Sequence, residues 1–459
     1  MSDLSQLVKA YDVRGIVPDQ LDESVARALG TAFVEMLRGA GDDADRIVIA
    51  HDMRDSGPGL AAAFAAGANS AGAAVVHIGL GSTDQLYYAS GSLGLPGAMF
   101  TASHNPARYN GIKLCRSGAR PVGQDSGLAT VRERAQELLD SGATADDAPQ
   151  RLERRDLLAA YAAHLRTLVD LAGIRPLKVV VDAGNGMGGH TVPAVLGDAV
   201  LRALPLEIVP LYFELDGSFP NHEANPLEPA NLVDLQAAVR EHGADLGLAF
   251  DGDADRCFVV DENGDAVSPS AITALVAARE LAKHPGGVVI HNLITSHAVP
   301  EIIVEHGGVP VRSRVGHSFI KAEMARTDAV FGGEHSAHYY FREFWFADTG
   351  MLAAMHVLAA LGGQERPLSE FAAEYERYAA SGEINSTVDD APARVAAVRA
   401  AFPDAEFDEF DGMTVQLADG AWFNLRASNT EPLLRLNVEA PKPDRMAALR
   451  DEVLAIVRG

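Results

Sequence analysis

The chain is short of cysteine and of basic residues, and each shortage excludes a class of protein. Its two cysteines, Cys115 and Cys257, lie in apolar stretches, so a disulfide scaffold and a thiol-rich metal site are excluded and two reduced core thiols are expected. Lysine and arginine together number 38 against 63 aspartates and glutamates, which gives a net charge of −25. So acidic a surface disfavours nucleic acid and anionic membranes as partners, although a local basic pocket can still bind a small anion.

Long apolar runs are missing as well. Residues 57–83 carry no charge, but their glycines together with Asn69 and His77 make them too polar for a bilayer span. The opening MSDLSQLVKAYDVRG lacks the basic leader and apolar stretch of a signal peptide. Together with the reduced cysteines, these features predict a cytoplasmic protein with no membrane partner, and we expect a monomer or a weak homodimer.

A loose repeat organises most of the chain. A Val/Ile-rich strand, a helical stretch and a second apolar strand recur three times, with first strands at 46–52, 178–186 and 287–296 and second strands at 73–79, 206–212 and 309–316. Continuous apolar strands that alternate with helices are typical of buried parallel strands in βαβ units. We therefore expect three similar α/β domains with mixed, mostly parallel sheets, over residues 1–150, 151–258 and 259–366.

The last part of the chain, residues 367–459, has a different pattern. EFDGMTVQLADGAWFNLRAS alternates apolar and polar residues, which predicts an antiparallel strand pair with its turn at 418–420. The segment MAALRDEVLAIVRG predicts a closing helix, so we expect a small α+β domain here. Stretches of small and polar residues at 141–150 and 362–369 are the predicted linkers.

Two segments, one in each of the first two predicted domains, carry candidate reactive groups. TASHNP (101–106) is a loop after an apolar strand, and Ser103 at its tip is either an ordinary capping serine or an exposed hydroxyl that accepts a phosphoryl group; Lys113 follows nearby. DGDADR (251–256) places Asp251, Asp253 and Asp255 so close together that their repulsion favours a bound cation with oxygen ligands.

Two alternatives to a metal loop exist for DGDADR. A calcium EF-hand requires glycine at the sixth position, where this chain has Arg256, and it requires helices on both sides, where CFVV indicates a strand. A solvated acidic turn is the other alternative. We favour the metal loop, and Arg256 at its edge can reach a phosphate.

Two further segments lie in the second half. GGEHSAH (332–338) offers a carboxylate and a hydroxyl for sugar hydroxyls and an imidazole for proton transfer, and VGHSFIK (315–321) adds a histidine and a lysine with the same ambiguity. RASNTEP (426–432) combines one guanidinium with three short donors, which suits phosphate oxygens, although a capped turn would have the same composition. A phosphoryl acceptor, a cation loop, a sugar clamp and a phosphate clamp together make a set for phosphoryl transfer.

In family order, these motifs resemble those of the α-D-phosphohexomutases, specifically the bacterial phosphomannomutase/phosphoglucomutase group. The resemblance runs from KAYDVRG (9–15) through TASHNP, NGIK, DGDADR and GEHSAH to RASNTEP, nearly the whole chain. It implies four domains around a central cleft, each contributing one active-site loop. Many relatives have glycine where Ala337 stands, and glucosamine-specific relatives often have glutamine where His335 stands.

The resemblance also implies roles for individual residues. Ser103 is the expected phosphoserine, and Mg²⁺ is expected on this group together with the three aspartates of the DGDADR loop. Residues matching positions of proton transfer or phosphate contact are Arg14, Lys113 and His338. The expected substrate-binding set, with Arg256 added from the acidic loop, is Tyr11, Arg256, His317, Glu334, Ser336, Arg426, Ser428, Asn429 and Thr430.

The implied activity is the interconversion of hexose 6-phosphate and hexose 1-phosphate, with mannose preferred and glucose also accepted. The phosphoserine would form a hexose 1,6-bisphosphate, which is both intermediate and activator, and phosphosugars would be the partners of the chain. Two alternatives stay open: a catalytically silent sugar-phosphate binding protein, and a phosphatase with an aspartate nucleophile in DGDADR. A phosphate on Ser103, as opposed to an aspartate, separates the mutase from the phosphatase.

Overall fold

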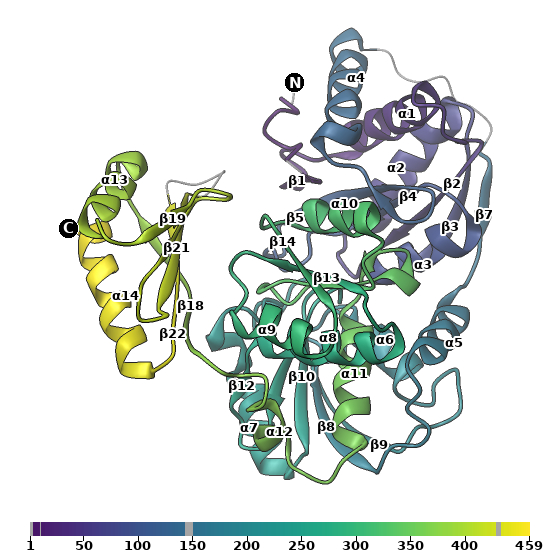
Figure 1. Cartoon of the computed structure of the whole chain (residues 1–459). Coiled ribbons are helices and arrows are strands. Elements are labelled where there is room, and N and C mark those ends of the chain that lie inside the picture. The colour runs from purple at the N-terminus through teal and green to yellow at the C-terminus, as the bar shows by residue number, and fades with distance from the viewer. Residues whose placement is uncertain (1–2, 10, 143–149, 428–432) are drawn as a thin grey trace.

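The computed structural model describes residues 3–9, 11–142, 150–427 and 433–459, and its strands form four sheets, one in each of four domains (Figure 1). Three α/β domains stack on one another, and the C-terminal domain stands apart on one side (Figure 1). This agrees with the expected fold class of three α/β domains and a final α+β domain.

The first sheet has the order β1-β5-β4-β2-β3-β7, with β6 added beside β5. The strands are β1 (Val13–Ile16), β2 (Arg46–His51), β3 (Ala74–Leu80), β4 (Gly97–Phe100), β5 (Tyr109–Arg116), β6 (Arg120–Pro121) and β7 (Leu152–Arg154). The helices are α1 (Glu23–Gly39), α2 (Gly57–Ser70), α3 (Thr83–Leu93) and α4 (Leu128–Ser141). The predicted βαβ unit is confirmed, because β2 and β3 pair in parallel on either side of α2.

The second and third sheets have the orders β12-β11-β10-β8-β9 and β14-β13-β15-β16-β17. The second contains β8 (Leu177–Asp182), β9 (Leu206–Leu211), β10 (Leu246–Phe250), β11 (Cys257–Asp261) and β12 (Ala266–Val267), with α5 (Leu158–Leu168), α6 (Gly188–Val195) and α7 (Val233–His242). The third contains β13 (Val288–Asn292), β14 (Val309–Ser313), β15 (Phe331–Gly333), β16 (Tyr339–Phe341) and β17 (Ala347–Asp348), with α8 (Pro269–Lys283), α9 (Ala298–Glu305), α10 (His317–Thr327) and α11 (Gly350–Gly362).

The three α/β sheets are mixed, as predicted, but they contain more antiparallel strand pairs than the expected "mostly parallel" sheets would. The pairs β8–β9 and β13–β14 are parallel, which confirms the other two βαβ units. Each sheet is then extended on one side by antiparallel strands, such as β10–β11 and β15–β16. The reason is local: a short loop joins these neighbours, and only an antiparallel pair can be joined by a short loop.

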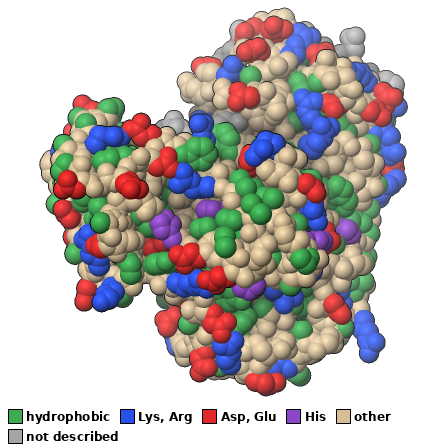
Figure 2. All heavy atoms as spheres, in the orientation of Figure 1, with side chains coloured by type: hydrophobic (Ala, Val, Ile, Leu, Met, Phe, Trp, Pro, Cys, Tyr) green, Lys and Arg blue, Asp and Glu red, His purple; other side chains and the backbone are tan. Residues whose placement is uncertain are grey.

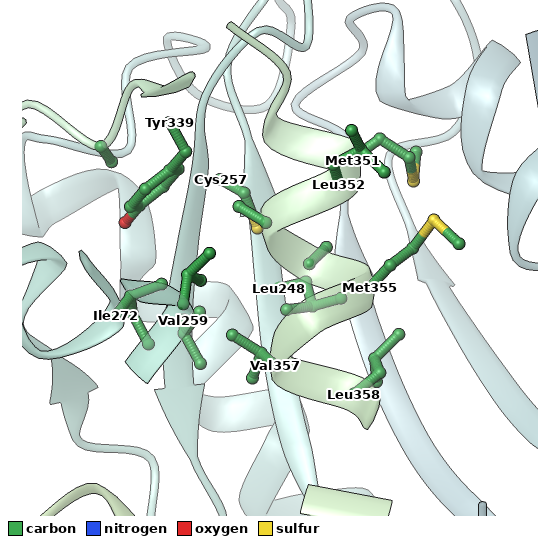
Figure 3. Packing of buried hydrophobic residues seen from close by; sticks show 14 of the residues in the cluster. Leu248, Cys257, Val259, Ile272, Tyr339, Met351, Leu352, Met355, Val357 and Leu358 are labelled. Carbon is green, nitrogen blue, oxygen red and sulfur yellow. The ribbon is translucent and has the colours of Figure 1, made fainter. Parts of the chain in front are cut away.

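The second and third domains share one hydrophobic core. Helix α11 is apolar on all sides and wholly buried, as expected for a helix enclosed by protein. Figure 3 shows Leu248 of β10 beside α11, and Val259 of β11 next to Ile272 of α8. The predicted domain limit after residue 258 falls inside β11, whose hydrogen bonds to β10 and β12 keep it in the second sheet.

The fourth domain has a core of its own and an antiparallel sheet, β18-β22-β21-β20-β19. Its strands are β18 (Ala379–Thr387), β19 (Glu406–Asp408), β20 (Met413–Gln416), β21 (Trp422–Ala427) and β22 (Leu433–Ala440), and its helices are α13 (Ala391–Ala401) and α14 (Pro443–Arg458), after the short α12 (Leu368–Ala372). The predicted hairpin is confirmed as β20–β21. Figure 2 shows this domain as a separate lobe, with a notch between it and the first domain.

The remaining expectations about the chain as a whole concern thiols and membranes. Cys115 and Cys257 are both free and buried, as predicted. Among the described residues, no helix has the length and apolarity required to cross a bilayer.

A buried carboxylate joins the first three domains. Asp84 of α3 accepts hydrogen bonds from Tyr161 of α5 at 2.7 Å, from Thr349 before α11 at 2.7 Å and from Ser82. Burial raises the pKa of Asp84 to about 6. The three hydroxyl donors stabilise this carboxylate and thereby fix the positions of three domains relative to one another.

We predict that Tyr161→Phe lowers the free energy of unfolding by about 1.5–3 kcal/mol, because it removes a buried hydrogen bond to a carboxylate. Tyr212→Phe is the matched control, since its hydroxyl donates to exposed Asp234 at 2.8 Å, and it should cost less than about 1 kcal/mol. Denaturant unfolding of both variants measures the difference. Equal losses would show that Asp84 does not join the domains energetically.

Candidate active site

Ser103 lies at the junction between the first and second domains. It is 5% exposed, and its Oγ donates to Asp251 Oδ2 at 2.7 Å. Arg256 Nη2 donates to the same hydroxyl at 3.3 Å, and His104 Nδ1 lies 3.2 Å from it. The structure therefore brings the predicted serine loop and acidic loop into direct contact, although they are far apart in the sequence.

The acidic loop follows β10, and its three carboxylates converge. Ligand atoms of Asp251, Asp253 and Asp255 all lie within 4.8 Å of one another, and all three side chains are buried. Asp253 Oδ1 and Asp255 Oδ1 are buried without a hydrogen-bond partner. Carboxylate oxygens left free in such a cluster are the donor set that a hard divalent cation requires, so these residues fit a metal ion.

Two cations of the chain partly offset the acidic loop. Lys113 Nζ of β5 lies 2.7 Å from Asp253 Oδ2 and 2.6 Å from Asp255 Oδ2, and Arg256 Nε donates to Asp251 Oδ2 at 2.9 Å. Burial alone would raise the pKa of Asp253, but the Lys113 ammonium and its hydrogen bond hold that pKa well below its usual value. Burial raises the pKa of Asp251 to about 7 despite the Arg256 guanidinium. Lys113 is thus a fixed ammonium, with a pKa well above its usual value because the two carboxylates outweigh burial.

The third loop joins this cluster through His338. Its Nε2 lies 3.8 Å from Asp255 Oδ1, and its Nδ1 lies 2.9 Å from Ser336 Oγ. Glu334 is buried and is held by Tyr340 Oη at 2.7 Å and by the amide of Gly316 at 3.0 Å. The imidazole of His338 is 21% exposed, so it is reachable from solvent and bridges the acidic loop and the sugar loop.

The remaining predicted residues lie around the same space. Tyr11 packs edge-on against His317, with ring centroids 4.8 Å apart, and Arg14 donates to the side chain of Asn105 in the serine loop. The pKa of Tyr11 is raised by burial, by Glu334 of the third domain and by Asp411 of the fourth. Groups from two other domains therefore act on this phenol of the first domain.

His317 is neutral in this environment. Burial and the Lys321 ammonium lower the pKa of His317 to about 3. Lys321 in turn pairs with Asp348 at 2.5 Å, and both side chains are buried. His317 can therefore exchange hydrogen bonds with a substrate but cannot carry a positive charge at neutral pH.

In the fourth domain the structure describes only part of the predicted phosphate clamp. Arg426 is the penultimate residue of β21, and its guanidinium lies 3.5 Å from Glu383 Oε2 and 4.0 Å from Asp411 Oδ2. Ser428, Asn429 and Thr430 lie outside the described residues.

Three loops of the site contain a non-glycine residue with left-handed backbone: Ser103 (φ 50°), Ala254 (φ 59°) and Ala337 (φ 64°). Each such residue costs about 1–2 kcal/mol relative to right-handed backbone. Backbone strain of this kind persists where the surrounding structure imposes it, and it concentrates at functional sites. At position 337, where many resembling proteins have glycine, the structure shows why glycine fits without strain.

Comparisons with known proteins agree with this geometry. Four family models match consecutive parts of the chain. They are phosphoglucomutase/phosphomannomutase α/β/α domain I over residues 5–138, domain II over 159–264, domain III over 268–378 and the C-terminal domain over 383–456. A Xanthomonas campestris protein with the name "Phosphohexose mutases" is 42% identical over 457 residues, which cover 98% of this chain and 99% of the relative. The chain belongs to the phosphoglucomutase/phosphomannomutase family.

Two further members of this family are similar over almost their full length. A phosphomannomutase of Salmonella montevideo is 42% identical over 441 residues, with 94% of each chain covered. The crystal structure of a phosphoglucomutase/phosphomannomutase family protein from Burkholderia thailandensis superposes with a TM-score of 0.87 at 32% identity, covering 100% of this chain and 98% of the other.

Several residues of the site were missed by sequence reasoning. Thr83 donates to Asp253 Oδ2 at 2.6 Å and thereby anchors the acidic loop to α3. Arg54 contacts the serine loop, and Asp348 pairs with Lys321. A threonine at a helix start, an arginine after a strand and an aspartate before a helix are common, so nothing local distinguishes them.

We predict that Asp253→Asn weakens binding of a divalent cation by tenfold or more, because it removes one of three charged oxygen ligands. Isothermal titration of the metal-free protein with MgCl₂ measures this. The matched control is Asp261→Asn at the end of β11, a carboxylate that only caps a turn by accepting from the amides of Asn263 and Asp265. Unchanged affinity in Asp253→Asn would contradict a metal site in this loop.

Proposed function

We propose that this chain is a hexose phosphate mutase that interconverts hexose 6-phosphate and hexose 1-phosphate through a phosphoserine at Ser103. The observation that carries the proposal is the 2.7 Å hydrogen bond from Ser103 Oγ to Asp251, inside a cluster of three carboxylates. A phosphoryl group on Ser103 would add about −1.5 to −2 charges beside these aspartates. Lys113 and Arg256 supply only two positive charges, so a divalent cation is needed for balance.

Mg²⁺ is the cation we propose, held by the three aspartates of the acidic loop together with the phosphorylated Ser103. It would supply charge neutralisation to the phosphoryl group in transit. The residues of the chain do the rest: Arg256 would donate to the phosphoryl oxygens, and Lys113 holds the carboxylates of Asp253 and Asp255 in place.

Transfer begins with a sugar hydroxyl that attacks phosphorus on Ser103. The new bond joins the sugar oxygen to phosphorus, the bond from Ser103 Oγ to phosphorus breaks, and the hydroxyl proton goes to a base. We assign the base to His338, because its imidazole is accessible and held by Ser336, whereas Lys113 is a paired ammonium with no free electron pair. The resulting hexose 1,6-bisphosphate turns around and returns its other phosphoryl group to Ser103.

Substrate binding is assigned to the rim of the same space. Glu334 and Ser336 would bind sugar hydroxyls, and Tyr11 and His317 would contact the substrate. Arg426 would hold the phosphate that does not react, together with Ser428, Asn429 and Thr430. Arg14, which donates to Asn105 of the serine loop, stays with the groups of proton transfer or phosphate contact. We keep four units as a proposal for what carries these loops, with the predicted limits 1–150, 151–258, 259–366 and 367–459, except that the second unit extends past residue 258 to include β11 and β12. We propose phosphosugars as the partners, no nucleic-acid or membrane partner, a cytoplasmic location and a monomer or weak homodimer.

We predict that Ser103→Ala loses mutase turnover by more than about 1000-fold while it remains folded, because the phosphoryl acceptor is removed. The assay is conversion of mannose 1-phosphate with a trace of glucose 1,6-bisphosphate. Ser56→Ala, which removes a nearby hydroxyl that accepts from Asn110, should stay within threefold of the parent. Intact-mass analysis should show a phosphoryl adduct on Ser103, and an adduct on an aspartate would point to a phosphatase instead.

The sugar preference is a separate prediction. We expect kcat/KM for mannose and glucose phosphates to agree within about tenfold, with mannose preferred, because the two sugars differ only at C2 and a pocket without a dedicated group there discriminates weakly. Glucosamine phosphate should be the poorest of the three. If it were at least tenfold better than mannose phosphate, the sugar assignment would be wrong and the mutase chemistry would stand.

A further inference from the structure

Arg54 is a buried arginine with an unusual set of partners. It follows β2 in the sequence and is 2% exposed. Its backbone amide donates to Asp52 Oδ1 at 2.9 Å, and its guanidinium lies 3.4 Å from Asp52 Oδ2. Asp52 therefore balances its charge and fixes its direction.

The guanidinium of Arg54 donates to four backbone carbonyls of the serine loop. Nη2 contacts the carbonyls of Ser103 at 2.9 Å and Asn105 at 2.6 Å, and Nη1 contacts those of Pro106 at 3.0 Å and Tyr109 at 2.9 Å. One planar group thus gathers the carbonyls of residues 103–109 around itself. Such a fork is specific to arginine, because a lysine offers a single point donor on a flexible stem.

The second domain closes over this arrangement from two sides. The ring of Phe219 lies 5.1 Å from the guanidinium carbon of Arg54. At Gly252, in the acidic loop, a Cβ atom would meet the carbonyl oxygen of Ser103 at 2.4 Å. The serine loop is therefore confined between the Arg54 fork and the backbone of the acidic loop, with no room for another placement of the Ser103 carbonyl.

We propose that Arg54 is a positioning residue for Ser103: its fork imposes the left-handed backbone of Ser103 and so aims Oγ at Asp251. This inference rests on the proposed function of Ser103 as phosphoryl carrier. Arg54 acts through the carbonyls and not through the hydroxyl, whose own partners are Asp251, Arg256 and His104. Loss of the fork lets the loop relax its strained residue, and a displacement of about 1 Å at a reacting atom can cost about 100-fold in rate.

The experiment compares Arg54→Lys with Arg166→Lys. Arg166 is a matched control because its guanidinium also donates to backbone carbonyls, those of Val195, Gly197 and Arg202, in the second domain. For each variant we would measure kcat and KM with mannose 1-phosphate, the rate of Ser103 phosphorylation by glucose 1,6-bisphosphate, and the melting temperature. We expect Arg54→Lys to lose about 100-fold in kcat and in phosphorylation rate with KM within threefold, and Arg166→Lys to keep both rates.

A second measurement does not depend on turnover. Amide hydrogen exchange of residues 101–109 should become at least tenfold faster in Arg54→Lys and stay unchanged in Arg166→Lys. If Arg54→Lys fails to fold, the milder variant Phe219→Leu replaces it, and the rate of amide hydrogen exchange in residues 101–109 should rise in that variant too.

The outcomes separate the two proposals. A parent protein without mutase activity or Ser103 phosphorylation would refute the proposed function, and exchange in residues 101–109 would still test Arg54. The positioning role would be overturned if the parent is active, the kcat of Arg54→Lys lies within threefold of the parent value, and amide exchange in residues 101–109 is unchanged. Equal rate losses in the Arg54 and Arg166 variants, following their melting temperatures, would also overturn it, because the effect would then be general stability.

Discussion

The repulsion among Asp251, Asp253 and Asp255 is the constraint around which the rest of the site is arranged. Three buried carboxylates within 4.8 Å are unstable without compensation, and the chain supplies it from two domains. Lys113 comes from β5 of the first sheet, and Arg256 comes from the acidic loop itself. Because the Lys113 ion pairs cross the boundary between domains, neutralising the loop also docks the second domain onto the first.

That docking determines where strain is stored. The serine loop is pressed between Gly252 and the guanidinium of Arg54, and Ser103 adopts left-handed backbone there. Ala254, within the acidic loop, and Ala337, in the sugar loop, adopt the same conformation. A site in which reactive groups are held by backbone contacts needs little rearrangement when charge moves, and phosphoryl transfer depends mainly on such preorganisation.

The distribution of hydrophobic cores fits the same arrangement. The second and third domains share a core through α11, so the acidic loop and the sugar loop are fixed relative to each other. The fourth domain has a separate core and meets the third through polar contacts such as Glu439 with the amide of His297. Asp411 of the fourth domain reaches the rim of the site, where its carboxylate accepts a hydrogen bond from the amide of Val315. The domains joined by shared packing and ion pairs carry the phosphoryl chemistry, and the separate lobe carries Arg426.

The sequence by itself determined the βαβ units, because Val/Ile runs such as 178–182 can only be buried strands, and it determined the hairpin around 418–420 through strict alternation. It also singled out two candidate loops: the three aspartates stand too close together to coexist without a cation, and Ser103 stands on a loop tip, although only the family resemblance implied its role. Tertiary structure decided what depends on distant partners. Only the fold shows that Lys113 is a paired ammonium, that Arg54 donates to four carbonyls and that β11 belongs to the second sheet. Each of these facts rests on a hydrogen bond or an ion pair between residues that no local pattern connects.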